Sequence, residues 1–159
     1  MVLRLLRLLG CAGEPEGGQA FQVGCDRAVL GAQRVGDREQ LIQAILNIAR
    51  NAAQAIKAQS SSSPVAGQIT LRTRVARQVT LAKKRHRLAL EVQVIDNGPG
   101  IPDDIRERMF YPLVSGREGG SGLGLTLAQS FVQQHQGMIE CESRPGYTCF
   151  SIRMPLGGA

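Results

Sequence analysis

Apolar residues recur at helical spacing over residues 37–57 and predict a long helix with one buried face. Asp37, followed three residues later by Gln40, is typical of the capping box at which a helix begins. The serine-rich run 60–64 then predicts a loop. The expected apolar stripe consists of Leu41, Ala44, Ile45, Ile48, Ala52, Ala55 and Ile56.

Alternation of apolar and polar residues predicts two antiparallel strands, over 68–76 and 88–96. The basic run Lys83 to Arg87 lies between them and is interpreted as a solvated loop. A weaker strand candidate covers 21–25, near the start of the chain. These segments indicate a sheet whose strands lie mostly after the long helix in the sequence.

Two further helices follow the second strand. A short helix is predicted over 102–108, with Pro102 in its first turn, and a longer one over 122–136. Gly137 is expected to end the longer helix, as glycine commonly does. The packing stripe expected on it consists of Leu123, Leu127 and Phe131.

The chain ends in a predicted hairpin, with strands over 138–143 and 147–154 and a turn at Arg144-Pro145-Gly146. Its 159 residues are the size of one domain. Aromatic residues make up only 4%, so the interior is expected to consist of Leu, Ile, Val and Ala. This composition suits a sandwich of helices and sheet.

The net charge of +6 favours an anionic ligand. Because the basic run contains no aromatic residue that could stack on bases, we expect no nucleic-acid partner. No apolar stretch approaches the ~20 residues of a membrane span, so no membrane partner is expected. The cysteines form neither a CxxC pair nor a disulfide framework, which indicates reduced thiols in a cytoplasmic protein. They are Cys11, Cys25, Cys141 and Cys149.

A cluster of glycines lies at the entry to the longer predicted helix. The first N–H groups of a helix have no partner within it and lie at the positive end of its dipole, so they can bind phosphate. Glycine leaves this backbone open to an anion. Neither G-x-G-x-x-G nor G-x-x-x-x-G-K-[ST] occurs, which excludes Rossmann and P-loop sites; a flexible linker remains the alternative. The glycines are Gly119, Gly120, Gly122 and Gly124.

The stretch DNGPGIP places Asp96 at the end of an apolar strand, with Gly98 and Gly100 in the turn that follows. A half-buried carboxylate needs a hydrogen-bond donor, and the exocyclic amine of a purine can serve. Gly98 would let a flat base pack close to the chain. The alternative is a tight turn in which Asp96 caps its own backbone.

Asn47 and Asn51 are four residues apart in an otherwise apolar helix, so both amides project from the same face. Asparagine is costly to bury without hydrogen bonds. Amide oxygens can coordinate magnesium, which takes most of its ligands from water and phosphate. The alternative is a pair of amides bonded to neighbouring loops.

These three groups, in this order, resemble the ATP-binding catalytic domain of sensor histidine kinases, in the GHKL (Bergerat) superfamily with gyrase, the heat-shock chaperone ATPases and the mismatch-repair ATPases. The resemblance covers about residues 36–156. Residues 1–35 match poorly, so the catalytic domain is expected over 36–159. The sequence of the segment FYPLVSGREGGSGLGL resembles that of the NtrB type of nitrogen-regulation kinases. The matching segments are 47–56 (asparagine box), 96–102 (first glycine box), 109–125 (phenylalanine and second glycine boxes) and 146–150 (closing Gly-Thr element).

The resemblance implies an α+β, two-layer sandwich in which three helices cover a mixed sheet of about five strands. It also implies the nucleotide contacts. Asn51 would hold magnesium, Asn47 would lie near the phosphates, Asp96 would accept from the adenine amine, and Thr148 would support that contact. Gly98, Gly100 and Ile101 would belong to the same ATP-binding set.

The remaining implied contacts come from a lid over about 101–120. Phe110 and Tyr111 would anchor it, and Arg117 would reach the terminal phosphate. The phosphate-facing backbone would be that of Gly120, Gly122, Leu123 and Gly124.

The implied activity is a histidine kinase that uses ATP and magnesium. The ATPases of the superfamily have a glutamate at the position of Asn47, and its absence here favours phosphoryl transfer over hydrolysis. Neither His86 nor His135 is followed by an acidic residue, as the family's phosphoacceptor histidine is. The γ-phosphate is therefore expected to go to a histidine of a separate dimerisation domain, because this chain is an excised domain or acts in trans.

The implied partners are that phosphoacceptor domain, an NtrC-like response regulator and the PII signal protein. Two alternatives share the same sequence boxes. One is a nucleotide-gated binding module without transfer, and the other is a serine kinase of the anti-sigma type.

Overall fold

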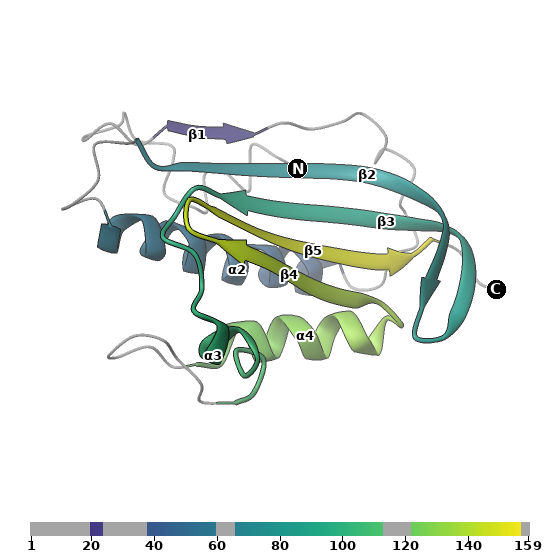
Figure 1. The fold of residues 1–159 in the computed structure, drawn as a ribbon. Helices are drawn as coiled ribbons and strands as arrows, with labels where there is room; N and C mark the ends of the chain where they lie inside the picture. Colours follow the sequence, from purple (N-terminus) through teal and green to yellow (C-terminus); the bar gives the residue numbers. More distant parts are fainter. Residues whose placement is uncertain (1–19, 24–37, 60–65, 113–121, 157–159) are drawn as a thin grey trace.

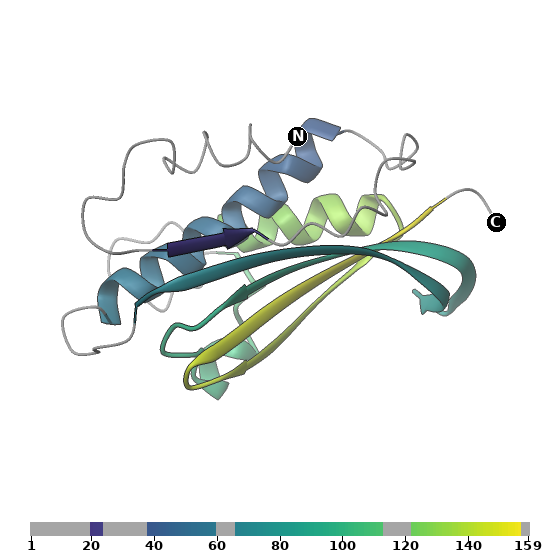
Figure 2. The same ribbon diagram turned by 90° about the horizontal axis from the view of Figure 1, so that it is seen from above.

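The structure, a computed structural model, describes residues 20–23, 38–59, 66–112 and 122–156. Within these residues one mixed sheet forms a layer, and the two longer helices lie against one of its faces (Figures 1 and 2). No helix in this part of the chain is both long and apolar enough to cross a membrane. The elements are β1 (Ala20–Val23), α2 (Arg38–Gln59), β2 (Gln68–Leu81), β3 (Lys84–Asp96), α3 (Asp103–Arg106), α4 (Gly124–Gln134), β4 (Met138–Arg144) and β5 (Tyr147–Pro155).

The sheet has the strand order β1-β2-β3-β5-β4. β1 pairs with β2 in parallel, whereas all other neighbours are antiparallel. This arrangement confirms the predicted two-layer α+β sandwich with a mixed sheet. It also brings the ends of β3 and β5 together, so that Asp96 lies opposite Thr148.

The core lies between the sheet and the two longer helices. Ile48 in the middle of α2 is fully buried, and so are Val132 of α4 and the central residues of β3 and β5. α4 packs chiefly against α2 rather than against the sheet. Burying these aliphatic side chains is the main stabilising contribution, at ~25 cal/mol for each Å² of apolar surface removed from water.

The packing stripe expected on α4 was right at Phe131 and wrong at Leu123 and Leu127. Leu123 and Leu127 are 44% and 61% exposed. The buried face consists of Ala128, Phe131 and Val132. Two overlapping stripes satisfy the helical period in this segment, and the sequence pattern favoured the one with larger side chains. Packing of α4 against α2 decides which of the two stripes is buried.

The basic run 83–87 was also predicted wrongly, as a loop. β2 and β3 continue to a two-residue turn at Ala82 and Lys83, both with positive φ (46° and 65°), as in a type I′ hairpin. Lys84 to Arg87 therefore belong to β3, where His86 is buried to 8% exposure. Charged side chains do not prevent strand formation when their long stems reach solvent.

This hairpin carries the positive charge of the chain. Residues 68–90 contain seven Lys or Arg and no Asp or Glu, so the rest of the sequence is close to neutral. The hairpin turn and Asp96 lie at opposite ends of β3, whose 13 residues extend about 40 Å. The positive charge of the chain therefore lies away from the Asp96 end of the sheet.

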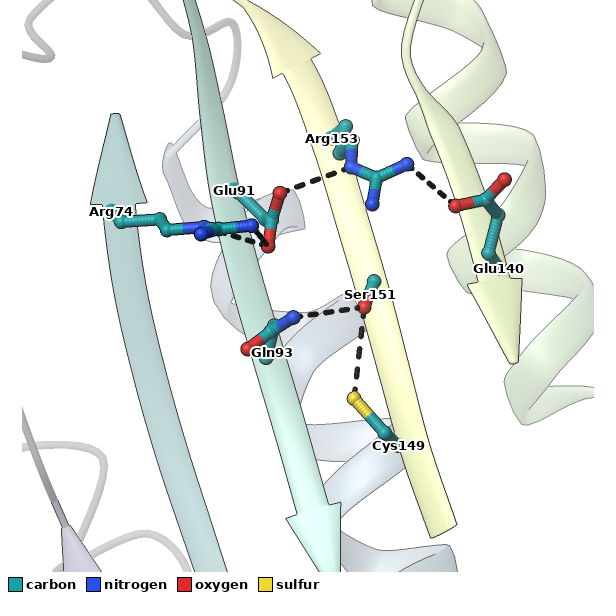
Figure 3. Close-up of polar contacts among 7 residues, drawn as sticks. All are labelled: Arg74, Glu91, Gln93, Glu140, Cys149, Ser151 and Arg153. Atoms are coloured by element: carbon teal, nitrogen blue, oxygen red, sulfur yellow. Dashed lines mark hydrogen bonds and ion pairs between the residues drawn. The ribbon is translucent and has the colours of Figure 1, made fainter. Parts of the chain in front are cut away.

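An ion-pair network crosses the sheet face that the helices do not cover (Figure 3). Glu91 of β3 is 1% exposed and accepts bonds from Arg74 (2.9 Å) and Arg153 (3.0 Å). Arg153 also pairs with Glu140 at 2.6 Å. Burial lowers the pKa of Arg153, but its bond to Glu91 and the charge of Glu140 outweigh burial and raise it. The network ties β2, β3, β5 and β4 together.

Gly137 lies just after α4, but it is not the residue with left-handed backbone. Gln136 has the positive φ (56°), and the N–H of Gly137 bonds to the carbonyl of Val132 at 2.8 Å. A Cβ on Gly137 would meet the carbonyl oxygen of Arg153 at 2.5 Å and Val132 Cγ1 at 2.9 Å. Glycine is therefore needed here for close approach to β5, not for backbone conformation.

We expect Gly137→Ala to lower the free energy of unfolding by about 1–3 kcal/mol, because a backbone oxygen cannot move aside as a side chain can. Denaturant titration of the whole domain measures this. Gly146→Ala is the comparison, since nothing lies within 4 Å of its added Cβ and only its φ of 80° opposes the change. An equal or smaller loss at position 137 would contradict the steric explanation.

Candidate functional site

Asp96 is the last residue of β3 and is 5% exposed. Its Oδ1 accepts a hydrogen bond from the N–H of Gly98 at 2.9 Å. The tight turn considered as an alternative is therefore present. This turn fixes the direction of the carboxylate at the end of the sheet.

Close packing around this turn requires both of its glycines. A Cβ on Gly98 would lie 2.8 Å from Asp96 Oδ1 and 3.6 Å from Ala55 Cβ on α2. Gly100 has a φ of 85°, and its Cβ would lie 2.8 Å from the backbone of Arg144. The turn is thus held between α2 on one side and the β4–β5 hairpin on the other.

The hairpin and the turn are joined by hydrogen bonds. Gly146 donates its N–H to the carbonyl of Gly98 at 3.0 Å. Ser143 Oγ accepts from the N–H of Ile101 at 2.8 Å and lies 3.0 Å from Thr148 Oγ1. Thr148 itself is 3% exposed. The predicted residues Asp96, Thr148 and Ile101 are therefore brought together.

Ser143 was missed by the sequence reasoning. The signal was available, because a hairpin with a two-residue turn pairs Arg144 with Tyr147 and therefore Ser143 with Thr148. A cross-strand neighbour of a candidate residue on the same face is itself a candidate.

The second half of the site lies where α2 meets the beginning of α4. Asn47 Nδ2 donates to the carbonyl of Gly124 at 3.2 Å, and Gln43 Nε2 donates to Asn47 Oδ1 at 3.4 Å. A Cβ on Gly124 would lie 3.6 Å from Asn47 Cβ. α4 begins at Gly124, so Gly122 and Leu123 precede it rather than forming its first turn.

α2 joins the two halves. Asn47 contacts Gly124, and Ala55 is in van der Waals reach of Gly98. Positions 47, 51 and 55 lie on one side of the helix at successive turns, and the two contacts are about 12 Å apart along its axis. Asn51 is half-buried. Along α2 it therefore lies between the contact with the first residues of α4 and the contact with the Asp96 turn.

The lid positions are described only in part. Phe110 is half-buried against the core, whereas Tyr111 is 63% exposed. Thr126 Oγ1 lies 3.3 Å from the carbonyl of Phe110 and 3.4 Å from that of Gly122, which has a φ of 63°. Two predicted site residues, Arg117 and Gly120, lie outside the described residues, as do Gly119, Asp37, Cys11 and Cys25.

The donor set fits a nucleotide and magnesium. A buried carboxylate beside a glycine turn suits a base amine, since any side chain at position 98 would crowd it. Within the described residues no cluster of His, Cys, Asp or Glu could hold a metal by itself. An amide such as that of Asn51 suits magnesium, which takes its other ligands from phosphate and water.

Cys141 lies on the helix-facing side of β4 and is partly buried. Burial, followed by the nearby Cys149, raises the pKa of the Cys141 thiol to about 12. Because the thiolate is the reactive form, this cysteine is inert near neutral pH.

We expect iodoacetamide at pH 8 to modify Cys141 in the folded domain on the order of a thousandfold more slowly than an unperturbed thiol of pKa ~8.5. The rate should rise with pH beyond pH 9. Mass spectrometry of each cysteine-containing peptide measures this, with the denatured chain as control. Rapid labelling at neutral pH would show that Cys141 is not held as a protonated thiol.

Residues 36–158 match the protein family described as "Histidine kinase-, DNA gyrase B-, and HSP90-like ATPase". The chain is 52% identical over 120 residues to the sensory histidine kinase/phosphatase NtrB of Salmonella typhimurium, covering 76% of this chain and 33% of that protein. It is 44% identical over 127 residues to NtrB of Rhodobacter capsulatus, covering 77% and 33%. The chain thus spans about a third of the length of these relatives.

Solved structures give the same result for the fold. The catalytic domain of histidine kinase ThkA has a TM-score of 0.65 at 22% identity, covering 98% of this chain and 94% of that one. Full-length ShkA, solved in complex with AMPPNP, has a TM-score of 0.71 at 24% identity and covers all of this chain and 31% of its own. The described strands and helices therefore form the fold of histidine kinase catalytic domains.

Proposed function

Since this chain belongs to the family of histidine kinase-, DNA gyrase B- and HSP90-like ATPases, we propose that it is the ATP-binding catalytic domain of a two-component sensor kinase for nitrogen regulation. It binds ATP with magnesium and transfers the γ-phosphate to a histidine on a separate dimerisation domain. The nitrogen-regulation role rests on the likeness to NtrB.

One observation carries the proposal. α2 contacts the glycine at the beginning of α4 through Asn47 and the Asp96 turn through Ala55, with Asn51 between them. A base accepted by Asp96 at one end and phosphates at the other are thereby set at a fixed separation. Positioning of this kind is the main requirement of phosphoryl transfer.

Different residues would contact the base, the phosphates and magnesium. Asp96 accepts the base amine and Thr148 lies beside it, so the base is oriented. The backbone before α4, at Gly122 and Leu123, lies at the positive end of the helix dipole, where phosphate is favoured. Arg117 and Gly120 complete the phosphate contacts in the same proposal. Magnesium, held by Asn51, would neutralise charge on the phosphate oxygens.

Transfer is favoured over hydrolysis by the chemistry of Asn47. An amide cannot take a proton from water as a carboxylate can. Asn47 Nδ2 is also engaged with the carbonyl of Gly124, where it holds two helices together. Water is therefore poorly activated at this position, and the γ-phosphate remains for a histidine acceptor.

The partners follow from the same proposal. The phosphoacceptor domain supplies the histidine, an NtrC-like response regulator receives the phosphate, and the PII signal protein adjusts the activity. The cytoplasmic location expected from the cysteine usage belongs to this proposal as well.

Incubation of the chain with a separately produced phosphoacceptor domain, magnesium and labelled ATP tests the proposal. We expect label on the partner that is stable to base and labile to acid. Acid-stable label would indicate a serine kinase instead. Nucleotide binding without any label on the partner would leave only a nucleotide-gated binding module.

A further inference from the structure

Three polar groups at the base end of the site form a chain, of which the proposed function uses only Thr148. The N–H of Ile101 donates to Ser143 Oγ at 2.8 Å, and Ser143 Oγ lies 3.0 Å from Thr148 Oγ1. Ser143 is half-buried and Thr148 is buried. Arg106 Nη1 donates to the carbonyl of Ser143 at 3.3 Å, which holds this residue from the backbone side.

Either hydroxyl can donate in the bond between Ser143 and Thr148, and the N–H at the end of this chain favours Ser143 as the donor. Ser143 Oγ already accepts from the N–H of Ile101, and accepting one bond makes a hydroxyl a better donor. With Ser143 as the donor, Thr148 Oγ1 accepts this bond, and the Thr148 hydroxyl can donate its own proton to another group. Asp96 is the cross-strand neighbour of Thr148, on the same face of the sheet.

We propose that Ser143 is a positioning residue that sets the selectivity of the site for a base carrying an exocyclic amine. Its hydroxyl fixes that of Thr148 as a donor toward the Asp96 side. The carboxylate is thereby held as an acceptor of an amine, and a base without that amine gains nothing from the arrangement. This inference rests on the proposed function, because it concerns the same nucleotide site.

Calorimetric titration of the chain with ADP and with purine riboside diphosphate, which lacks the 6-amine, tests the inference. We expect Ser143→Ala to weaken ADP binding about fivefold, the usual effect of one neutral hydrogen bond. Binding of the amine-free analogue should change less than about twofold. Ser143→Thr, which keeps the hydroxyl, should restore the preference for ADP.

Ser151→Ala is the matched control. Ser151 lies on the neighbouring strand, its hydroxyl bonds to Gln93 at 3.4 Å on the other face of the sheet, and neither ligand should change affinity. If Ser143→Ala is too unstable to titrate, Ser143→Cys replaces it, since a thiol retains the volume but bonds weakly.

The two levels of failure can be separated. If Ser143→Ala loses affinity equally for both ligands, or for neither, the proposed role of Ser143 is overturned. The proposed function is still upheld in that case if the unaltered chain binds ADP. An unaltered chain that binds neither nucleotide overturns the proposed function itself.

Discussion

Replacing Asp96 by asparagine is expected to weaken ATP binding about a hundredfold or more while the domain stays folded. The substitution keeps Oδ1, which accepts from Gly98 N–H in the turn after β3. It removes the charge and replaces the second oxygen by an amide donor, which opposes the donor on the base amine. A site built to accept one hydrogen bond rejects a mismatched donor strongly, because both groups are left buried and unpaired.

Calorimetric titration with ATP and denaturant unfolding measure the two halves of this expectation. Asp104→Asn is the control, since Asp104 lies on the exposed surface of α3, 4.0 Å from Arg108. It removes the same charge from the protein without touching the sheet end. Nucleotide affinity that survives Asp96→Asn in a folded domain would exclude Asp96 as the base contact.

The second large effect is expected at Asn51. Asn51→Ala should reduce label transfer to the phosphoacceptor domain about a hundredfold or more, because charge on the transferring group is then poorly neutralised. Nucleotide binding without magnesium should change far less. The position of Asn51 on α2, one turn from both the Asn47 and the Ala55 contacts, is the structural basis of this expectation.

Transfer assays over a range of magnesium concentrations, with ATP affinity measured in parallel, check this. Lys57→Ala serves as the control, since Lys57 is exposed on the last turn of the same helix. If neither the unaltered chain nor Asn51→Ala transfers phosphate, while both still bind partner proteins, the result favours the nucleotide-gated binding module. Transfer that depends on magnesium as in the unaltered chain would remove Asn51 as a metal ligand.

Sequence reasoning performed best where local pattern and tertiary structure agree. α2 was predicted nearly to its observed end, because an apolar stripe that long has one helical solution. The four main strands and two of their pairings, β2 with β3 and β4 with β5, were predicted, since alternation at period two and a turn at Pro145-Gly146 leave little freedom. The pairing of β3 with β5 was not predicted. The order of the asparagine and glycine segments also led to the family that the comparisons show.

Prediction from the sequence failed where a neighbouring element determines which residues are buried or paired. Leu123 and Leu127 are exposed because α4 packs against α2 through its other face, which carries Ala128, Phe131 and Val132. The basic hairpin was taken for a loop because charge density is a poor guide to strand ends when the backbone can still pair. Ser143 was overlooked because its importance comes from its cross-strand partner Thr148.

By itself the sequence determined the chemistry available: a carboxylate after an apolar strand, two amides on one helix face, and glycines at a helix entry. Only the tertiary structure decided that α2 links Gly124 to Gly98, that the positive charge lies at the far end of the sheet, and that Ile101, Ser143 and Thr148 form one chain of bonds. The reason is physical. Periodicity and residue type record what each position does to its own backbone, whereas distances between segments are fixed by close packing across the core.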